Sequence, residues 1–314
     1  MSVKTQPIQT PAEIARKQGF WWNEAGTMPE LTSEPSQTQR GTPYLQSPGL
    51  VLLAKPQTEL VGMTEFLRGF GPDLGFLDTI NEYLESDLEP AAQVCKASGQ
   101  LCYLSFGPNR TPNKEAARYF ENILSSGHFS VLEHANFTFL FYGISRSLTH
   151  ELVRHRHMSF SQVSQRYVDG SKLRFVERPE FAANPALHEA FVNRIDMTAI
   201  EYEAIATSLL MAQEGGEATL SAKSKTDRRK RVNQGARAVL PNDTEAPIIV
   251  TANARAWRHF LEMRATPHAE VEIRRLAFLT WLALAITAPL LFGDFTPHKQ
   301  ADDAWTLITP YRGA

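Results

Sequence analysis

The apolar stretch at residues 276–292 limits the possible folds most, because only Thr280 and Thr287 interrupt it with polar side chains. A membrane span needs about 18 or more consecutive apolar residues. This stretch falls just short, and Pro289 breaks it. An amphipathic turn at residues 271–275 leads directly into it. The sequence therefore predicts a long buried helix over residues 268–288 inside a globular core, and no membrane association.

The composition is that of an ordinary globular protein. A chain of 314 residues with 43% hydrophobic content can bury a full core. The net charge of -2 gives no general attraction to nucleic acid, so any anion binding depends on local clusters. Cys95 and Cys102 are too few for a disulfide scaffold, and no histidine beside them suggests zinc. Reduced thiols and the lack of a secretory signal predict a cytoplasmic protein.

Residues 1–48 carry many Pro, Gln, Thr and Ser residues, which predicts an irregular N-terminal extension. Within it, Phe20-Trp21-Trp22 is expected to pack on the domain or on a partner subunit. Residues 49–314 are expected to form one domain. Strands are predicted at residues 49–55, 134–142 and 245–252, and helices at 113–124, 187–212, 226–240, 254–263 and 268–288. Few strands among long helices predict an α+β fold, a small sheet flanked by long helices.

Residues 154–167 combine three arginines, two histidines, three serines, two glutamines and a tyrosine, and no Asp or Glu occurs from 152 to 168. Guanidinium groups bind phosphate bidentately, while hydroxyls and carboxamides orient a heterocycle. The pattern therefore favours a nucleotide or phosphorylated cofactor over a solvated basic helix end. The spacing of Ile144, Leu148 and Leu152 predicts a helix carrying Arg154 and His155 near its C-terminal end, with the serine-rich half following as a loop.

Three further clusters allow two interpretations each. Residues 127–134 are either a ligand-positioning loop or a site of core histidines. The basic run at residues 225–231 is either a solvated helix face or a contact to phosphate or nucleic acid. Asn253, Trp257 and Arg264 are close enough along a helix for several of them to face one pocket.

His150 and His155 superficially resemble a zinc-protease pair, but they are five residues apart instead of four. At about 100 degrees per residue, their side chains diverge by roughly 140 degrees on a helix. Arg154 occupies the position that a ligand needs, and its cation repels a metal ion. We therefore expect no metal site.

The motif Arg154-His155-Arg156, Ser159, Ser164, Arg166 and Tyr167 resembles the R-H-R-x(2)-S-x-N-E-x-S-x-R-Y motif of flavin-dependent thymidylate synthases. Four more segments follow the family's order, at residues 127–134, 236–241, 253–255 and 264–268. The likeness extends from about residue 90 to 295. The chain has Ser161 and Gln162 where many members have Asn and Glu, which leaves open whether Gln162 contacts flavin, nucleotide or both.

The resemblance implies reductive methylation of dUMP to dTMP in a homotetramer whose subunits share active sites. It implies FAD as hydride carrier, with NADPH and methylenetetrahydrofolate as co-substrates, and residues 49–314 as the catalytic domain. Arg264 would be catalytic and would stabilise the ionised pyrimidine. The residues implied for dUMP are Glu151, Arg154, Gln162, Ser164, Gln165, Arg166, Arg237 and Arg264. Those implied for FAD are Ser130, Arg154, His155, Arg156, Gln162, Asn253, Arg255 and His259, and His128, Tyr103 and Lys230 are candidates for the folate or NADPH site.

Three rival hypotheses stay open at this point. A flavoprotein of this fold that methylates another uracil-containing substrate would share the pyrimidine contacts. A nucleic-acid-binding protein would use residues 225–231 and lose affinity steeply with salt. A zinc hydrolase would contain stoichiometric metal.

Overall fold

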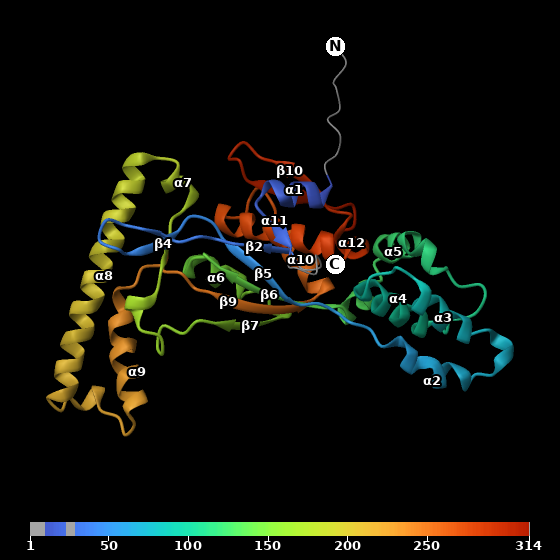
Figure 1. The fold of residues 1–314 in the computed structure, drawn as a ribbon, viewed down its shortest axis with the longest axis horizontal. Coiled ribbons are helices and arrows are strands. Elements are labelled where there is room, and N and C mark those ends of the chain that lie inside the picture. The colour runs from blue at the N-terminus through green and yellow to red at the C-terminus, as the bar shows by residue number, and fades with distance from the viewer. Residues whose placement is uncertain (1–9, 23–28, 314) are drawn as a thin grey trace, which may run out of the picture.

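The computed structural model describes residues 10–22 and 29–313, which form a mixed α and β structure (Figure 1). The helices are α1 (Pro11–Lys17), α2 (Thr64–Arg68), α3 (Leu77–Glu85), α4 (Pro90–Cys102), α5 (Ala116–Ser125), α6 (Arg146–Leu152), α7 (Pro179–Ala182), α8 (Pro185–Glu214), α9 (Lys225–Ala236), α10 (Ala254–Arg264), α11 (Val271–Thr287) and α12 (Pro289–Phe292). The strands are β1 (Trp21–Trp22), β2 (Pro29–Leu31), β3 (Ser36–Gln37), β4 (Pro43–Leu45), β5 (Gly49–Ala54), β6 (Asn136–Tyr142), β7 (Met158–Gln162), β8 (Phe175–Val176), β9 (Ile248–Asn253), β10 (Thr296–Lys299) and β11 (Trp305–Ile308).

The main sheet has six antiparallel strands in the order β1-β2-β5-β6-β9-β7. Two small sheets accompany it, β3-β4-β8 and the β10-β11 hairpin. The predicted phenylalanine strand is confirmed as β6, and Phe137, Phe139 and Phe141 are all fully buried on one face. β7 lies at the edge of the sheet and pairs with β9. The arginine-rich motif therefore lies where the sheet borders solvent.

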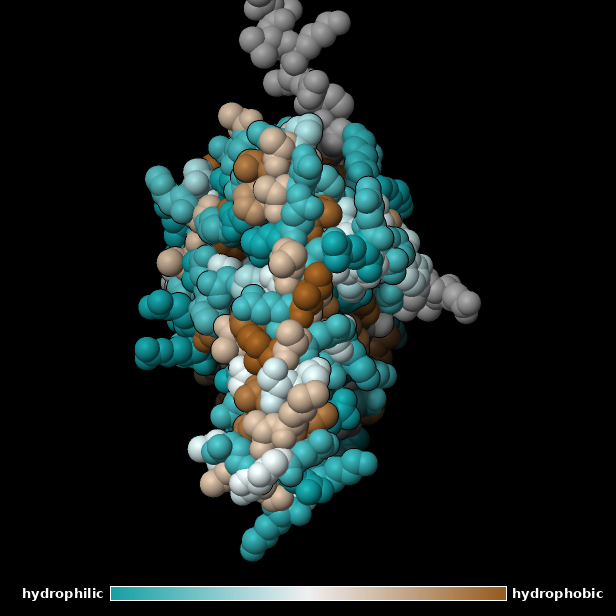
Figure 2. Space-filling view, turned by 90° about the vertical axis from the view of Figure 1, so that its left-hand side faces the viewer, coloured by the Kyte–Doolittle hydropathy of each residue, from teal (hydrophilic) through white to brown (hydrophobic). Residues whose placement is uncertain are grey.

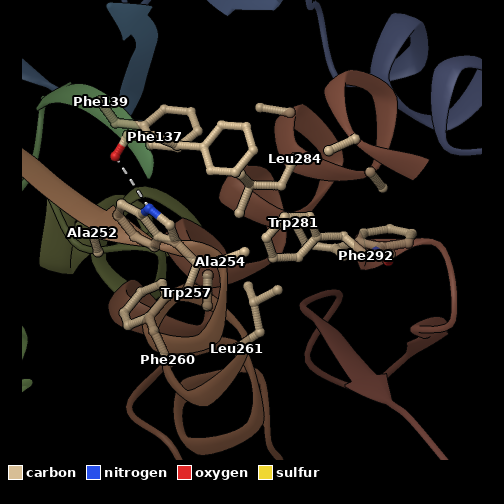
Figure 3. Packing of buried hydrophobic residues seen from close by; sticks show 14 of the residues in the cluster. Phe137, Phe139, Ala252, Ala254, Trp257, Phe260, Leu261, Trp281, Leu284 and Phe292 are labelled. Atoms are coloured by element: carbon tan, nitrogen blue, oxygen red, sulfur yellow. Dashed lines mark hydrogen bonds between the residues drawn. The ribbon is translucent and has the colours of Figure 1, made fainter. Parts of the chain in front are cut away.

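The core forms where α10 and α11 cover the buried face of β6. The predicted apolar helix is confirmed as α11, and its stretch from Leu276 to Ala285 is buried. Figure 3 shows Trp257 of α10 beside Phe137 and Phe139, with its indole N–H donating to the carbonyl of Phe137 at 3.3 Å. No helix among residues 10–22 and 29–313 has the length and hydropathy needed to cross a bilayer. The sheet and α10 thus share one apolar cluster.

The expectation of an irregular segment before residue 49 is wrong for much of the part that the structure describes. Thr10 and Glu13 form a reciprocal capping box that begins α1, and β2 pairs with β5 in the main sheet. Ile14 and Phe20 are buried in the main core, and Trp22 packs against it. The composition hid these short elements because pairing and burial against the domain, not local propensity, stabilise them. Residues 1–9 and 23–28 lie outside the described range.

The predicted serine-rich loop is also wrong, because its first half is strand β7. Backbone pairing with β9 extends this segment, and its residues alternate between exposed Ser159 and Ser161 and more buried neighbours. The preceding helix, α6, ends at Leu152, so Arg154 and His155 follow it instead of lying on it. The motif therefore spans a helix end, an edge strand and a loop.

Two long helices form an arm beside the main sheet, α8 and α9, which lie side by side at the left of Figure 1. Both were predicted. α8 has 30 residues. α9 ends at Ala236, and a 3-10 turn continues to Val239 where the sequence predicted helix. Phe191 and Ile195 of α8 join Tyr44 and Phe175 in a separate apolar cluster, which anchors the arm.

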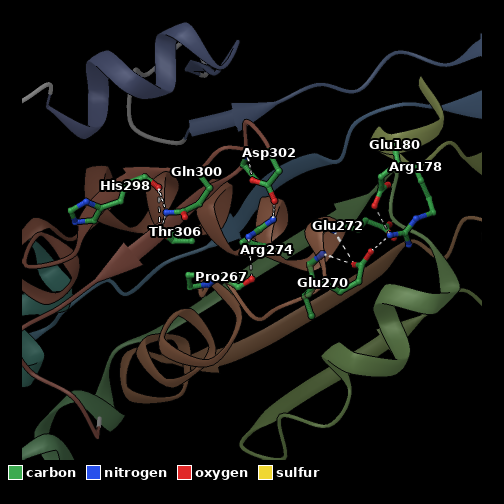
Figure 4. A network of polar contacts seen from close by, with 12 residues as sticks. Arg178, Glu180, Pro267, Glu270, Glu272, Arg274, His298, Gln300, Asp302 and Thr306 are labelled. Carbon is green, nitrogen blue, oxygen red and sulfur yellow. Dashed lines mark hydrogen bonds and ion pairs between the residues drawn. The ribbon is translucent and has the colours of Figure 1, made fainter. Parts of the chain in front are cut away.

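A polar network fixes the segment between α10 and α11 (Figure 4). Arg274 contacts the carboxylate of Asp302 and donates to the carbonyl of Pro267 at 3.5 Å. The buried carboxylate of Glu272 accepts the backbone N–H and the hydroxyl of Ser145, each at 2.7 Å. Since Ser145 caps α6 and Pro267 follows α10, the network ties both helices to the start of α11. Arg264 ends α10, three residues before Pro267.

Candidate functional site

A cleft of about 700 Å³ lies between α10 and the chain that leads into β7. The residues that line it are Glu133, Arg154, His155, Arg156, His157, Met158, Asn253, Arg255, Ala256, His259, Met263 and Arg264. This volume is within the range of small-molecule and cofactor sites. Of the residues that the resemblance implied for FAD, it gathers Arg154, His155, Arg156, Asn253, Arg255 and His259. Arg264, the implied catalytic residue, lies at its wall.

Local structure explains how these side chains meet. Asn253 ends β9 and caps α10, because its Oδ1 accepts the N–H of Ala256 at 2.9 Å. The N-terminus of α10 borders the cleft, where the helix dipole favours an anion. Pairing of Met158 with Ala252 places residues 154–157 alongside this helix start. Two segments far apart in sequence thus form one wall.

Arg264 is fixed by contacts from both sides of the motif. Its Nε–H donates to Nε2 of His155 at 3.1 Å. Its Nη1 donates to the carboxylate of Glu151 at 2.6 Å, and its Nη2 to the Glu151 carbonyl at 3.2 Å. The guanidinium is therefore oriented before any ligand arrives.

His155 is buried between the aromatic rings of α10, with ring centroids 5.2 Å from Phe260 and 5.9 Å from His259. Burial, followed by the nearby positive charge of Arg264 and by His259, lowers the pKa of His155 to about 4. The imidazole is therefore neutral near pH 7. With Nε2 accepting from Arg264, the ring proton belongs on Nδ1.

The remaining arginines of the cleft differ in their partners. Arg255 pairs with Glu133 at 2.7 Å. Within the described residues, the exposed side chains of Arg154 and Arg156 have neither an ion-pair nor a hydrogen-bond partner. Two uncompensated guanidinium groups beside a helix N-terminus suit a phosphate or diphosphate.

A second group of predicted residues lies apart from the cleft, around the loop after β7. Arg166 donates from Nε to Oε1 of Gln234 on α9 at 3.2 Å. Lys230 donates to the Tyr167 hydroxyl at 2.7 Å, which lowers the pKa of that phenol. Gln162, Ser164, Gln165 and Arg237 do not line the cleft either, and Gln162 donates to the hydroxyl of Thr149 on α6 at 3.2 Å. Gln165 is buried, and its Nε2 has no partner in the described part of the chain.

Several predicted positions lie elsewhere. Ser130 and His128 are exposed around the 3-10 turn before β6, and Tyr103 is exposed at the end of α4. Of the three residues expected to include several that face one pocket, Asn253 and Arg264 line the cleft, whereas Trp257 is fully buried in the core. Its large ring packs against the apolar side chains of β6, including Phe139.

The cleft also contains residues that sequence reasoning did not assign to a site: Glu133, His157, Met158 and Met263. Glu133 belongs to the 127–134 segment, three residues after Ser130, so its place in that segment was a usable signal. Met263 lies on α10 four residues after His259, and helical spacing would have placed both on one face. Across residues 10–22 and 29–313, no three His, Cys, Asp or Glu side chains are grouped as metal ligands.

The cleft has the positive charge and the N–H donors that suit an anionic nucleotide or cofactor, and sequence comparison identifies the family. The family described as thymidylate synthase complementing protein matches residues 84–290. The chain is 40% identical over 259 residues to a flavin-dependent thymidylate synthase of Mycobacterium sp. (strain KMS), covering 81% of this chain and 95% of that protein. It is 40% identical over 258 residues to the enzyme so named from Mycobacterium avium (strain 104), covering 82% and 97%, respectively. The corresponding protein of Mycobacterium leprae (strain Br4923) is 38% identical over 263 residues, with 82% and 97% covered. This chain therefore belongs to the flavin-dependent thymidylate synthase family.

Proposed function

We propose that this protein converts dUMP to dTMP by reductive methylation, with methylenetetrahydrofolate as carbon donor, FAD as hydride carrier and NADPH as reductant. The observation that carries the proposal is the cleft in which Arg264 is held beside two unpaired arginines. In the net reaction, C5 of uracil loses a proton and gains a methylene carbon, and a hydride reduces that carbon to methyl. Because the hydride comes from NADPH, the folate leaves as tetrahydrofolate.

The residues present fit FAD. The guanidinium groups of Arg154 and Arg156 supply the N–H donors that a diphosphate needs, and the dipole of α10 adds positive potential at its N-terminus. Asn253 and His259 add polar groups at the same wall. When bound, FAD would supply hydride transfer, which no side chain performs. We assign Ser130, Gln162 and Arg255 to the same cofactor site on the strength of the family motif. The motif also implies His155 there, although its Nε2 bonds to Arg264.

Uracil C5 is a weak nucleophile, so the enzyme must add a thiolate at C6 or stabilise negative charge on the ring. Burial raises the pKa of Cys95 to about 12, so its thiol stays protonated. Cys102 is exposed on α4 and does not line the cleft. Arg264 is therefore the group that we assign to stabilise charge on the pyrimidine.

We place dUMP against residues of both groups: Glu151, Arg154, Gln162, Ser164, Gln165, Arg166, Arg237 and Arg264. His128, Tyr103 and Lys230 are assigned to the folate or NADPH site. Since Arg166, Arg237 and Lys230 lie toward α9 in a single chain, a complete site would need a second subunit. A homotetramer with shared sites meets this need.

The outer surface of α8 supports such an assembly. Met197 and Met211 are 61% and 65% exposed. Together with Ile200 and Ala204 they occupy one helical face, at spacings of three, four and seven residues. Figure 2, which looks at the side of the molecule that carries α8, shows hydrophobic side chains gathered among polar ones. An apolar stripe on a monomer surface is typical of a subunit interface.

The two free cysteines support a cytoplasmic location.

Release of tritium from C5-labelled dUMP tests the reaction. Purified protein is supplied with methylenetetrahydrofolate and NADPH, and the assay is repeated after the flavin is removed and again after FAD is restored. We expect release that disappears without FAD and returns with it. Absence of release from folded, FAD-loaded protein would contradict the proposal and direct attention to other uracil-containing substrates.

A further inference from the structure

The guanidinium of Arg264 makes three hydrogen bonds within the chain, which hold it in place without a ligand. A guanidinium carries five N–H donors. Three are committed, one to His155 and two to Glu151. Two N–H bonds, one on each terminal nitrogen, have no partner among the described residues. The protein contacts therefore determine where these two donors point.

We propose that Glu151 and His155 are positioning residues for Arg264, which hold its guanidinium so that the two uncommitted N–H groups meet the pyrimidine. This inference rests on the proposed function and deepens it. The family motif alone assigns Glu151 to dUMP and His155 to FAD. The contacts in this chain give both residues a role in holding Arg264, since Nε2 of His155 and two oxygens of Glu151 bond to it.

His155 suits this role because its ring is fixed and its nitrogen can accept. Phe260 and His259 hold the buried ring in edge-on contact. A protonated imidazole would present an N–H to the Nε–H of Arg264, and the contact would become repulsive. The desolvated site keeps the ring neutral, so the acceptor is available throughout the physiological pH range.

Glu151 complements it through two separate atoms. Its carboxylate and its own carbonyl bind different nitrogens of Arg264, which fixes the rotation of the guanidinium plane. The pair is partly buried, with Arg264 20% and Glu151 34% exposed. The segment that carries Glu151 is fixed in turn, because Ser145 at the start of α6 is bonded to buried Glu272. Helix α6 thus connects Arg264 to the core, through Glu151 near its end and Ser145 at its start.

Two substitutions of His155 separate positioning from flavin binding. His155→Gln replaces Nε2 with a carboxamide oxygen of similar reach, whereas His155→Phe keeps the ring shape and removes the acceptor. Misplacement of a catalytic group by about 1 Å costs on the order of 100-fold in rate. We therefore expect His155→Phe to lower kcat for tritium release by about this factor, with a smaller change in KM for dUMP, and His155→Gln to recover most of it. Both variants should retain FAD and reduce it with NADPH at the normal rate.

A double substitution gives the second test. If His155 acts through Arg264, adding His155→Phe to Arg264→Ala should lower kcat no further, because the two changes remove one function. Glu151→Gln, which keeps an acceptor without the charge, should lose less activity than Glu151→Ala. Equal loss of flavin in both His155 variants, or additive losses in the double variant, would overturn the inference. A wild-type enzyme without tritium release would instead remove the proposed function, and the inference would fall with it.

Discussion

The cleft and the loop after β7 hold two halves of one sequence motif, and they differ in how complete they are. Arg154, His155 and Arg156 precede β7 and line a cleft together with α10. Arg166 and Tyr167 follow the strand and make their contacts with α9. At about 3.3 Å per residue, a five-residue strand separates its ends by roughly 16 Å. The two ends of the motif therefore lie on different surfaces of the same chain.

This difference suggests why the motif spans an edge strand. A strand at the edge of the sheet can present one end to its own chain and the other to a neighbour. In the cleft, Arg264 is already oriented by two side chains. On the other side, Gln165 carries a buried amide nitrogen without a partner in the described residues. The cleft is preorganised within one chain, whereas the second group includes a buried polar atom that the described residues leave without a hydrogen bond.

The largest expected effect comes from separating the subunits. Met197→Glu combined with Met211→Glu places two charges on the apolar face of α8. We expect dissociation to monomers, measured by light scattering, and no detectable dTMP formation from protein that remains folded. Leu84→Glu is the matched control, because Leu84 is 62% exposed, close to the 61% of Met197, and lies on α3 at the opposite end of the molecule (Figure 1). A folded monomer with full activity would contradict the proposal that the second group needs another subunit to complete the site.

The sequence predicted the elements whose signals are local. The alternation of Phe137, Phe139 and Phe141 and the apolar run within α11 required no tertiary information. β7 was missed because serines have weak strand preference, and its conformation comes from pairing with β9. The short elements before residue 49 were missed for the same reason, since β2 exists through its pairing with β5.

The residue types that line the cleft could be predicted from the sequence, but their hydrogen-bond partners could not. The motif gave the arginines and histidines, and the role that the resemblance implies for Arg264 stays a prediction. Nothing in the spacing showed that Glu151 and His155 both bond to Arg264, because 113 and 109 residues separate them from it. The location of Glu133 opposite Arg255 is a similar long-range contact.

A smaller effect, and a sharper test of the two halves, is subunit complementation. Arg264→Ala and Arg166→Ala should each lower turnover by about 100- to 1,000-fold, the usual cost of losing one charge-stabilising donor. Arg264→Ala should retain FAD. If each site takes its cleft from one chain and its α9 side from another, random mixing of the two variants should restore about one quarter of the sites.

The control mixes Arg264→Ala with Arg154→Ala, since both residues line the cleft of one chain. That mixture should stay inactive, because every site needs both groups from the same subunit. Equal recovery in both mixtures would show that the division at β7 does not correspond to a division between subunits. No recovery in either, with mixed tetramers present, would place all these residues in one chain's site.

The smallest expected effect is that of Ser164, which lies in the loop after β7 and accepts the backbone N–H of Arg166 at 3.3 Å. As a serine it resembles a nucleophile in type, but no histidine or carboxylate is hydrogen-bonded to it in the described residues. We therefore expect Ser164→Ala to raise KM for dUMP by roughly tenfold or less, the worth of one hydrogen bond, and to leave kcat nearly unchanged. Ser164→Thr, which keeps the hydroxyl, should recover the affinity if the pocket admits the methyl group. A fall in kcat of several orders of magnitude in the alanine variant, with KM and FAD content unchanged, would mean that this hydroxyl takes part in the chemistry and does more than bind the nucleotide.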